Sequence, residues 1–264
     1  MKVTVFTGNQ PRHLALIRRL AAVSDSVWAV MECGTVFPGQ VPDFYRKSEV
    51  MQRYFGHVIE AEARLFGGLA FLPAGVRALP IKAGDLNLLV PSQLEDALAS
   101  DIYIVFGADY IKGWLAEHLV SRQAVNIHMG LSPYYRGSSC NFWALHDGRP
   151  GYVGATIHHL SRGLDSGPML YHALPRLEDE NPFEFTMRAV DAAQKSLVER
   201  ISDGSLMSME PQPQDRRAQL RYSVNAEFTD AVALEFLERG LGHGELRAAL
   251  ERDPRPELLH PYFG

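Results

Sequence analysis

Cysteine is scarce in this sequence, and long apolar runs are missing from it. The two cysteines, Cys33 and Cys140, lie far apart and fit no metal-ligand spacing, so we expect two reduced thiols and no metal site. No run approaches the ~18–20 apolar residues that a membrane helix needs. The first residues, MKVTVFTGNQ, lack the apolar core and the small-residue cleavage site of a signal peptide. These absences predict a cytoplasmic protein without a membrane partner.

An excess of basic residues is also missing. Of the 264 residues 22% are charged, and the formal net charge is −5. Proteins that bind nucleic acid usually neutralise phosphates with clustered Lys and Arg, so we expect no nucleic-acid partner. The pattern G-x-G-x-x-G does not follow the first predicted strand, which argues against a nicotinamide-dependent dehydrogenase. The chain is nevertheless 46% hydrophobic, which is enough to build a large core.

The order of the predicted elements indicates an α/β fold. A β-branched strand over 2–7 is broken at Gly8-Asn9-Gln10-Pro11, and a helix over 13–22 and a strand over 26–32 follow. This succession is the opening of an open, mostly parallel Rossmann-like sheet with helices on both faces. The near-continuous apolar strand over 102–106 supports this fold, because such a sheet is covered on both faces.

The same alternation continues to about residue 205, after which the composition changes. Residues 209–219 are rich in Pro, Gln and Arg, which indicates a linker. We therefore predict a main domain over 1–205 and a linker with a small C-terminal extension over 206–264. The other predicted elements are helices over 42–66, 92–99, 114–120, 138–146, 181–201, 228–240 and 245–252, and strands over 124–128, 154–160 and 169–173.

The strand over 124–128 ends in the most suggestive residues of the chain. Asn126 and His128 lie two positions apart, so both side chains project from the same face of the strand. The carboxyl edge of an open α/β sheet is where ligands bind. An amide and an imidazole there can both donate hydrogen bonds to an oxygen that becomes negative during a reaction.

A carboxylate would orient this histidine and favour its charged form. Asp165, in the turn GLDSGP, is the candidate, because Gly163, Gly167 and Pro168 shape a turn that can present it. Asp147 is nearer in sequence, but it lies in a helix-ending Asp-Gly and is better explained as a cap. Each of these pieces taken alone is common, and a lone buried histidine usually serves packing.

The wider pattern resembles the folate-dependent formyltransferases. The stretches NIHMGLSPYYRG (126–137) and FWALHDGRPGYVGATIHHLSRGLDSGPML (142–170) are similar to that family, strongly across 101–174 and more loosely over 1–100 and 175–201. One departure is that this chain has Met-Gly-Leu-Ser-Pro after the histidine, where many members have Pro-Ser-Leu-Leu-Pro. The residues that follow the family order are Asn126, His128, Pro133, Arg136, Gly137, Trp143, Thr156, His158, Asp165 and Gly167.

The resemblance implies an enzyme and gives its residues roles. An amine attacks the formyl carbon of 10-formyltetrahydrofolate without a metal, Asn126 and His128 stabilise the oxygen, and Asp165 holds the histidine and helps to move a proton. His158 then supports His128 or simply packs. The resemblance places the folate against the end of the 102–106 strand and the loop before Asp165. The implied cofactor-binding residues are Phe106, Gly107, Ala108, Asp109, Tyr110, Ile111, Gly163 and Leu164.

The acceptor side is less well defined. Asn9 and Arg12 flank the start of the first helix, where backbone N–H groups can bind a phosphate, although a plain turn with a solvated arginine fits equally. Met129 and Gly130 lie in the loop beside the acceptor, and Arg136 follows directly. We expect these five residues to contact the substrate.

The acceptor itself is reached by elimination. The residues after 205 are too few and not basic enough for the tRNA-binding part of a methionyl-tRNA formyltransferase, so we expect a small-molecule amine. A nucleotide-linked amino sugar is the first candidate, and an amino-acid or hydroxamate-siderophore precursor is the second. A 10-formyltetrahydrofolate hydrolase and a non-catalytic folate sensor are the alternatives. The sequence leaves open the pathway, a homodimer and the role of the apolar C-terminal tail.

Overall fold

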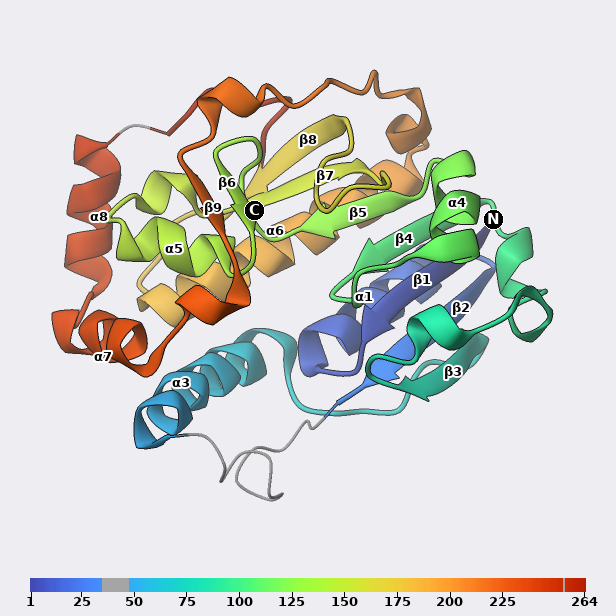
Figure 1. Cartoon of the computed structure of the whole chain (residues 1–264), viewed down its shortest axis with the longest axis horizontal. Coiled ribbons are helices and arrows are strands. Elements are labelled where there is room, and N and C mark those ends of the chain that lie inside the picture. Colours follow the sequence, from blue (N-terminus) through green and yellow to red (C-terminus); the bar gives the residue numbers. More distant parts are fainter. Residues whose placement is uncertain (35–47, 254) are drawn as a thin grey trace.

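Parallel strands build the centre of the molecule. The computed structural model describes residues 1–34, 48–253 and 255–264, and within them an eight-stranded sheet has the order β10-β8-β7-β5-β4-β1-β2-β3 (Figure 1). Every strand of this sheet runs in one direction except β7, which is antiparallel to both of its neighbours. The strands are β1 (Lys2–Gly8), β2 (Ser26–Cys33), β3 (Val76–Lys82), β4 (Ile102–Phe106), β5 (Val125–His128), β7 (Ala155–His159), β8 (Met169–Leu174) and β10 (Tyr262–Phe263).

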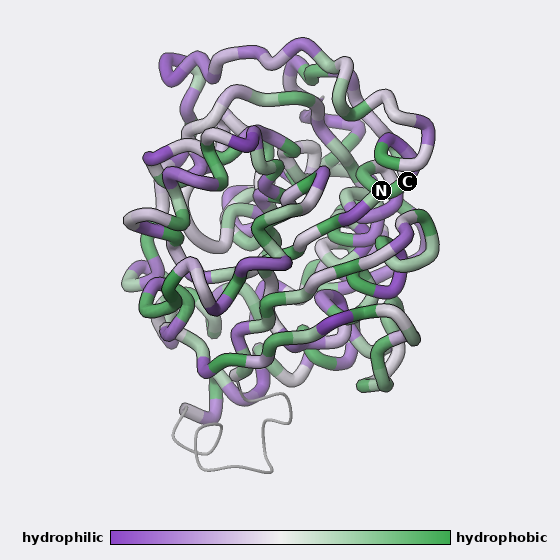
Figure 2. The backbone as a smooth tube through the Cα atoms, turned by 90° about the vertical axis from the view of Figure 1, so that its right-hand side faces the viewer, coloured by the Kyte–Doolittle hydropathy of each residue, from purple (hydrophilic) through white to green (hydrophobic). Residues whose placement is uncertain are grey.

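Helices cover both faces of this sheet, as the sequence predicted. On one face α1 (Pro11–Val23), α3 (Glu49–Phe66) and α6 (Pro182–Ser202) share an apolar cluster with side chains such as Val3 and Ile104. On the other face α4 (Gly113–Ser121) packs with Phe6 and Val105. Figure 1 shows α6 crossing behind β5 and β7, and Figure 2 shows mostly apolar central strands with more hydrophilic stretches at the periphery.

Local sequence signals explain where the long helix α6 begins. Asn181 caps it, because its side-chain oxygen accepts hydrogen bonds from the backbone N–H groups of Phe183 and Glu184 at 2.9 and 3.1 Å. The Glu184 carboxylate accepts in return from the Asn181 backbone N–H, and Pro182 occupies the first turn, where it needs no donor. This capping box confirms the helix predicted over 181–201.

Most other predicted elements are confirmed, but the helix expected over 92–99 is wrong. That segment instead forms two short 3₁₀ turns, Pro91–Gln93 and Ala97–Ala99, because only Leu94 and Ala97 are buried in it and no continuous apolar face exists. Strand β3 was missed, since Pro80 interrupts its pattern, and a proline is tolerated there because β3 is an edge strand. The helix predicted over 42–66 is observed as α3, and residues 42–47 lie outside the described residues.

The C-terminal residues pack closely on the rest of the chain. Strand β9 (Arg221–Ser223) pairs with β6 (Tyr135–Gly137) in a separate two-stranded sheet, and β10 adds an edge strand beside β8. Figure 1 shows α7 (Asp230–Arg239) beside α3, and α8 (His243–Arg252) near α5 (Cys140–His146). A domain boundary at residue 205 remains a prediction, but the extension contributes to the surroundings of β5. Among the described helices, none has the length and apolar content to cross a membrane.

The junction of β6 and β9 gives a test of this arrangement. Gly137 has φ = +90°, and a Cβ atom there would overlap the carbonyl oxygen of Ser223. We expect Gly137→Ala to lower the free energy of unfolding by about 1–3 kcal/mol. Gly56, exposed in α3 with open space around it, is the matched control. Gly56→Ala should stabilise the protein by about 0.5–1 kcal/mol. Urea unfolding checks both, and equal effects would contradict the packing of β9 on β6.

Candidate active site

The site begins at the carboxyl end of β5. Val125 and Ile127 point into the apolar cluster that α1 and α6 cover. Because side chains alternate along a strand, Asn126 and His128 project from the opposite face. His128 is 7% exposed, and Asn126 is half-buried. The carboxyl ends of β1 and β4 meet at the same edge of the sheet, as the fold predicts for a ligand site.

The loop between β7 and β8 brings Asp165 to these two side chains. Its Oδ2 atom lies 3.3 Å from Nδ1 of His128, and the Asn126 amide donates to its Oδ1 atom over 3.4 Å. The three side chains that the sequence singled out therefore meet, although 39 positions separate Asn126 from Asp165. Their catalytic role remains a prediction, but the geometry on which it depends is present.

Asp165 is held in place by contacts that sequence reasoning missed. Its backbone has φ = +45°, a left-handed conformation that costs about 1 kcal/mol or more for a residue with a side chain. The side-chain amide of Gln214 donates to the carbonyl oxygens of Asp165 and Gly167 at 2.9 and 2.8 Å. Gly167 admits no side chain, since a Cβ atom would overlap the His159 carbonyl oxygen. Gln214 lies in the predicted linker, where no local signal marks it as part of a site.

The charges at the site favour an ion pair. Burial lowers the pKa of His128, but the Asp165 carboxylate and the Cys140 side chain beside the ring outweigh burial and raise it well above its ordinary value. Burial also raises the pKa of Asp165, and the charge and hydrogen bond of His128, together with the charge of Arg136, outweigh burial and hold it below its ordinary value. Near neutral pH the imidazole is therefore charged, and both ring nitrogens carry a proton.

His158, on the neighbouring strand β7, orients the amide. Burial and the charge of His128 lower the pKa of His158 to about 4, so this ring is neutral. Its Nδ1 atom lies 2.8 Å from the His159 carbonyl oxygen, so Nδ1 carries the proton and donates it. Its Nε2 atom then accepts from the Asn126 amide at 3.0 Å. Of the two roles considered for His158, support of the site fits this network better than packing alone, and the support acts through Asn126.

The other nitrogen of His128 has only long contacts. Its Nε2 atom lies 3.5 Å from the Tyr135 carbonyl oxygen and 3.6 Å from Sγ of Cys140. A Cβ atom at Gly130 would lie 2.8 Å from Nε2, so the glycine leaves that approach open. The Nε2 proton is thus weakly engaged and can be offered to a bound oxygen. Cys140 was expected only to be a reduced thiol, and its place beside the imidazole was not foreseen.

The predicted folate-binding segments lie beside each other, where one hydrogen bond joins them. Phe106 is buried at the end of β4, and Gly107, Asp109 and Tyr110 are exposed after it. The Glu32 carboxylate accepts from the Asp109 backbone N–H at 2.7 Å and so fixes this turn. The two predicted segments are joined where the Tyr110 hydroxyl donates to the Arg162 carbonyl oxygen at 2.6 Å.

The remaining residues of these segments differ in exposure. Ala108 is half-buried and Ile111 is buried, whereas Gly163 and Leu164 are exposed, Leu164 by 48%. The exposed residues of both segments can bind a heterocycle through main-chain groups. Folate binding there remains a prediction.

His13 is a second residue that sequence reasoning did not explain. It is 3% exposed, its ring packs edge-on against Phe106 at 5.0 Å between centroids, and a Cβ atom at Gly107 would overlap it. A Cβ atom at Gly8 would lie 2.6 Å from its Nδ1 atom. The ring thus fixes the start of α1 against the end of β4. Gly8 at the end of β1 and Gly107 after β4 were the sequence signals that could have indicated this close packing.

Of the predicted acceptor residues, two already have partners inside the protein. The Asn9 amide exchanges two hydrogen bonds with the Gly34 backbone, each 3.1 Å long. Glu62, which is 4% exposed, accepts from both the backbone N–H and the guanidinium of Arg12 at 3.0 and 2.8 Å. A carboxylate therefore occupies the start of α1, where a phosphate was considered. This contact disfavours the phosphate interpretation.

The second arginine predicted to contact the acceptor is turned inward. Arg136 is 6% exposed and donates to the Gln219 side chain at 3.3 Å and to the Leu164 carbonyl oxygen at 3.5 Å. Through its contact with Leu164, Arg136 therefore stabilises the loop that carries Asp165. Met129 and Gly130 directly follow His128, and Met129 lines a cavity that begins beside the site.

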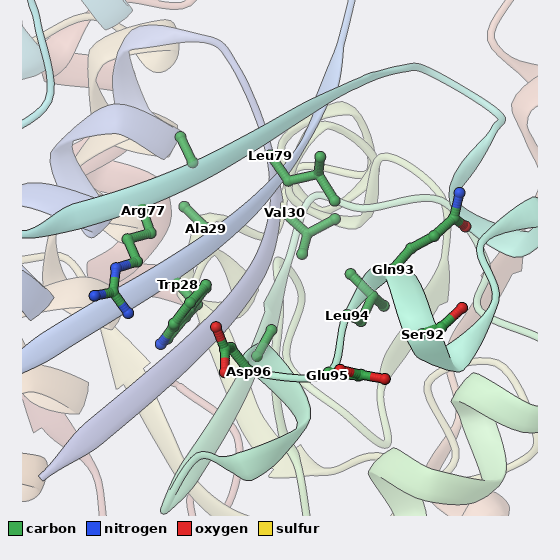
Figure 3. Close-up of a pocket in the computed structure, with 12 residues that line it drawn as sticks. Trp28, Ala29, Val30, Arg77, Leu79, Ser92, Gln93, Leu94, Glu95 and Asp96 are labelled. Atoms are coloured by element: carbon green, nitrogen blue, oxygen red, sulfur yellow. The ribbon is translucent and has the colours of Figure 1, made fainter.

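That cavity has a volume of about 320 Å³ and lies between α3, α5, α6 and α7. Arg12, Met129, Cys140 and Asn141 belong to its lining, together with six aromatic side chains and several aliphatic ones. A second hollow of about 390 Å³ lies elsewhere, on β2 and β3, where Trp28 and Arg77 face the segment that carries Glu95 and Asp96 (Figure 3). Strands β4 and β1 separate it from β5.

No group of three or more His, Cys, Asp or Glu side chains that could hold a metal ion occurs within residues 1–34, 48–253 and 255–264.

Comparison with known proteins identifies relatives of this chain. Residues 95–201 match the family model described as formyl transferase. A methionyl-tRNA formyltransferase from Thermosynechococcus vestitus is 26% identical over 217 residues, which cover 78% of this chain and 61% of that protein. A dTDP-4-amino-4,6-dideoxyglucose formyltransferase from Mycobacterium bovis is 29% identical over 140 residues, covering 50% of this chain and 57% of that protein. The chain thus spans less than two thirds of either relative.

A solved structure supports the fold. A 4-N formyltransferase from Francisella tularensis superimposes with a TM-score of 0.53 and 16% identity, over 86% of this chain and 77% of that one. The α/β fold and the family resemblance expected from the sequence are both confirmed.

The ion pair predicts how His128 titrates. In Asp165→Asn the carboxylate is gone while burial remains, so we expect the pKa of His128 to fall from above its ordinary value of about 6.5 towards or below it. NMR titration of the ring protons measures this, with the exposed Asp96→Asn as the control. An unchanged pKa would contradict the ion pair.

The same pair makes stability depend on pH. The Asp165 contribution is present above about pH 3.9 and is lost as the pH falls through its lowered folded pKa. The His128 contribution is present below about pH 6.5 and is lost as the pH rises through its raised folded pKa. We expect wild type to exceed Asp165→Asn in unfolding free energy most clearly between these two values.

Proposed function

We propose that this chain, whose residues 95–201 belong to the formyl transferase family, transfers the formyl group of 10-formyltetrahydrofolate to the amine of a small-molecule acceptor. One observation carries the proposal, namely the convergence of Asn126, His128 and Asp165. The Asp165 carboxylate lies between the other two, 3.4 Å from the Asn126 amide and 3.3 Å from the His128 imidazole. The match alone identifies the family of the central segment, and the geometry supplies the groups that the reaction needs.

The chemistry follows from what each group can donate. When an amine attacks the formyl carbon, the carbonyl oxygen becomes negative. The charged imidazole can donate its Nε2 proton to that oxygen, because this nitrogen has only long contacts. The Asn126 amide can donate the hydrogen that now makes the long 3.4 Å contact with Asp165, while His158 keeps the other hydrogen and the orientation.

The carboxylate has two tasks in this proposal. Asp165 keeps His128 charged, and it receives, directly or through water, the proton that the attacking amine must lose. The leaving nitrogen of tetrahydrofolate takes up a proton in exchange, so the site returns to its starting state. The pair works only while both members are ionised, which the raised pKa of His128 and the lowered pKa of Asp165 ensure near neutral pH.

Two features support a small-molecule acceptor. A cavity of about 320 Å³ begins beside His128, which is the size of a typical small-ligand pocket. One relative is named for a dTDP-linked amino sugar, so a nucleotide-linked amino sugar is the first candidate and an amino-acid or siderophore precursor the second. Another relative is named for methionyl-tRNA, and a tRNA acceptor is the competing proposal that assays must address.

We expect Asn126→Ala to lower kcat by about 10²–10³-fold, because one donor to the developing oxyanion is lost. The KM for 10-formyltetrahydrofolate should change little, since the amide acts mainly in the transition state. Asn225→Ala, which removes an exposed amide, is the matched control. A variant that kept its kcat would remove Asn126 from the mechanism.

Formate release tests the reaction class. With 10-formyltetrahydrofolate alone we expect slow formate release, and with a suitable amine we expect stoichiometric N-formyl product. Rapid release that no amine suppresses would replace the transferase by a hydrolase. Normal folate binding with neither product nor formate would favour a sensor.

A further inference from the structure

The cavity beside the catalytic side chains has an unusual lining. It lies between α3, α5, α6 and α7, and its volume of about 320 Å³ can hold one ring with its substituents. The aromatic rings of its wall pack edge to face, with Tyr54 in contact with the others at centroid distances from 5.0 to 6.2 Å. The aromatic residues that line it are Tyr54, Phe55, Phe142, Phe183, Phe228 and Phe236.

The cavity leads directly to the reacting groups. Met129 and Cys140 belong to its lining, and Sγ of Cys140 lies 3.6 Å from Nε2 of His128. A molecule seated in the cavity with an amine at this end would therefore present the amine to the imidazole. The cavity is thus placed to bind the part of an acceptor that adjoins its amine.

Among the described residues, the cavity offers no free positive charge. Arg12 is the only Lys or Arg among the described residues that line it, and buried Glu62 neutralises its guanidinium at 2.8 Å. The same carboxylate accepts from the Arg12 backbone N–H and so also occupies the start of α1. A phosphate brought here would be desolvated and would face a carboxylate, which is unfavourable.

Two polar groups of the lining lack partners among the described residues. Tyr54 is 9% exposed, and its hydroxyl has no hydrogen-bond partner in the part of the chain that the structure describes. Asn141 is 7% exposed, and its Oδ1 atom accepts from the Gly154 backbone N–H at 3.0 Å, while its amide nitrogen has no partner within the described residues. Neither atom is fully buried, although the residues largely are, so both atoms are open to a ligand in the cavity that the residues line.

We propose that this cavity binds the acceptor through an uncharged ring that carries a hydrogen-bonding group for Tyr54 and Asn141, and that no phosphate anchors it. This inference rests on the proposed formyl transfer and names the part of the acceptor that the site recognises. The ring stacks among the aromatic side chains, and any charged portion of a larger acceptor lies outside the cavity.

Much of the wall comes from segments outside the matched family region. Residues 95–201 carry the transfer chemistry, whereas Tyr54 and Phe55 precede this region and Phe228 and Phe236 follow it. Selection of the acceptor is therefore a property of this chain's own segments and does not follow from the family match.

Three amines and one ring without an amine test the inference. 4-Hydroxybenzylamine carries the ring and a hydroxyl, benzylamine lacks the hydroxyl, and glycinamide lacks the ring. We expect wild type to formylate both ring amines with a KM at least tenfold below that for glycinamide, since a ring buries considerable apolar area. Calorimetry with p-cresol, the ring and hydroxyl without the amine, measures occupation of the cavity independently of transfer.

Tyr54→Phe is the sharpest variant, because it removes a hydroxyl that makes no hydrogen bond to any described residue and should leave stability unchanged. We expect its KM for 4-hydroxybenzylamine and its Kd for p-cresol to rise about fivefold, while the KM values for benzylamine and for 10-formyltetrahydrofolate stay the same. Phe236→Ala should raise the KM for both ring amines at least tenfold. Phe71→Ala, at a phenylalanine that is 99% exposed, is the matched control and should change none of these values.

The outcomes separate this inference from the proposed function. One outcome overturns the inference and leaves the formyl transfer standing. In it, dTDP-4-amino-4,6-dideoxyglucose is formylated, neither ring amine is formylated, and Tyr54→Phe and Phe236→Ala leave the KM for the sugar nucleotide unchanged. If no amine is formylated but p-cresol binds and Tyr54→Phe weakens it, the transfer fails and the ligand class of the cavity stands. If p-cresol does not bind wild type and the ring amines show no preference over glycinamide, the inference is overturned.

Discussion

The buried contact between His128 and Asp165 is the interaction on which the site depends. Bringing two charges out of water is costly, and their attraction offsets this only when the geometry is good and the remaining polar atoms are satisfied. Here the second carboxylate oxygen accepts from Asn126, and the Asp165 carbonyl oxygen accepts from Gln214. Losing either charge would leave the other buried and uncompensated. The surrounding loops therefore act mainly to keep one carboxylate against one imidazole ring.

Three parts of the chain that are distant in sequence share this task. The sheet supplies Asn126 and His128, the β7–β8 loop supplies Asp165, and the residues after 205 supply Gln214 and Gln219. The last contribution gives the C-terminal extension a physical reason to pack closely, as it does where β9 pairs with β6. A change in the extension can reach the reacting atoms through the left-handed backbone of Asp165, because Gln214 helps to hold that conformation.

The period-two pattern of a strand was enough to place Asn126 and His128 on one face, and the glycines of the turn GLDSGP were enough to single out Asp165. The carboxylate is presented as that turn predicted, at 3.3 Å from the ring. Gln214 and Cys140 could not be found in this way, because their roles arise from contacts between segments whose own patterns are unremarkable for a linker and a short helix. The helix expected over 92–99 is wrong for a related reason. The local helix propensity of this segment is not supported by a continuous buried face, so only two short 3₁₀ turns form. Strand β3 was not predicted, because Pro80 interrupts its pattern and normally argues against a strand. An edge strand tolerates the proline.

The phosphate considered at the start of α1 shows why an acceptor is hard to infer from a motif. A glycine turn before a helix offers backbone donors, and Arg12 adds a positive charge, so the sequence is compatible with an anion. What decides the matter is Glu62, fifty positions later in α3, which brings its own carboxylate to both donors. The same helix carries Tyr54 into the neighbouring cavity. One helix thus neutralises the site for a charged ligand and supplies an aromatic wall for an uncharged one. Both effects follow from the packing of α3 beside α1, α6 and α7, and in our proposal this packing sets the class of amine that can approach His128.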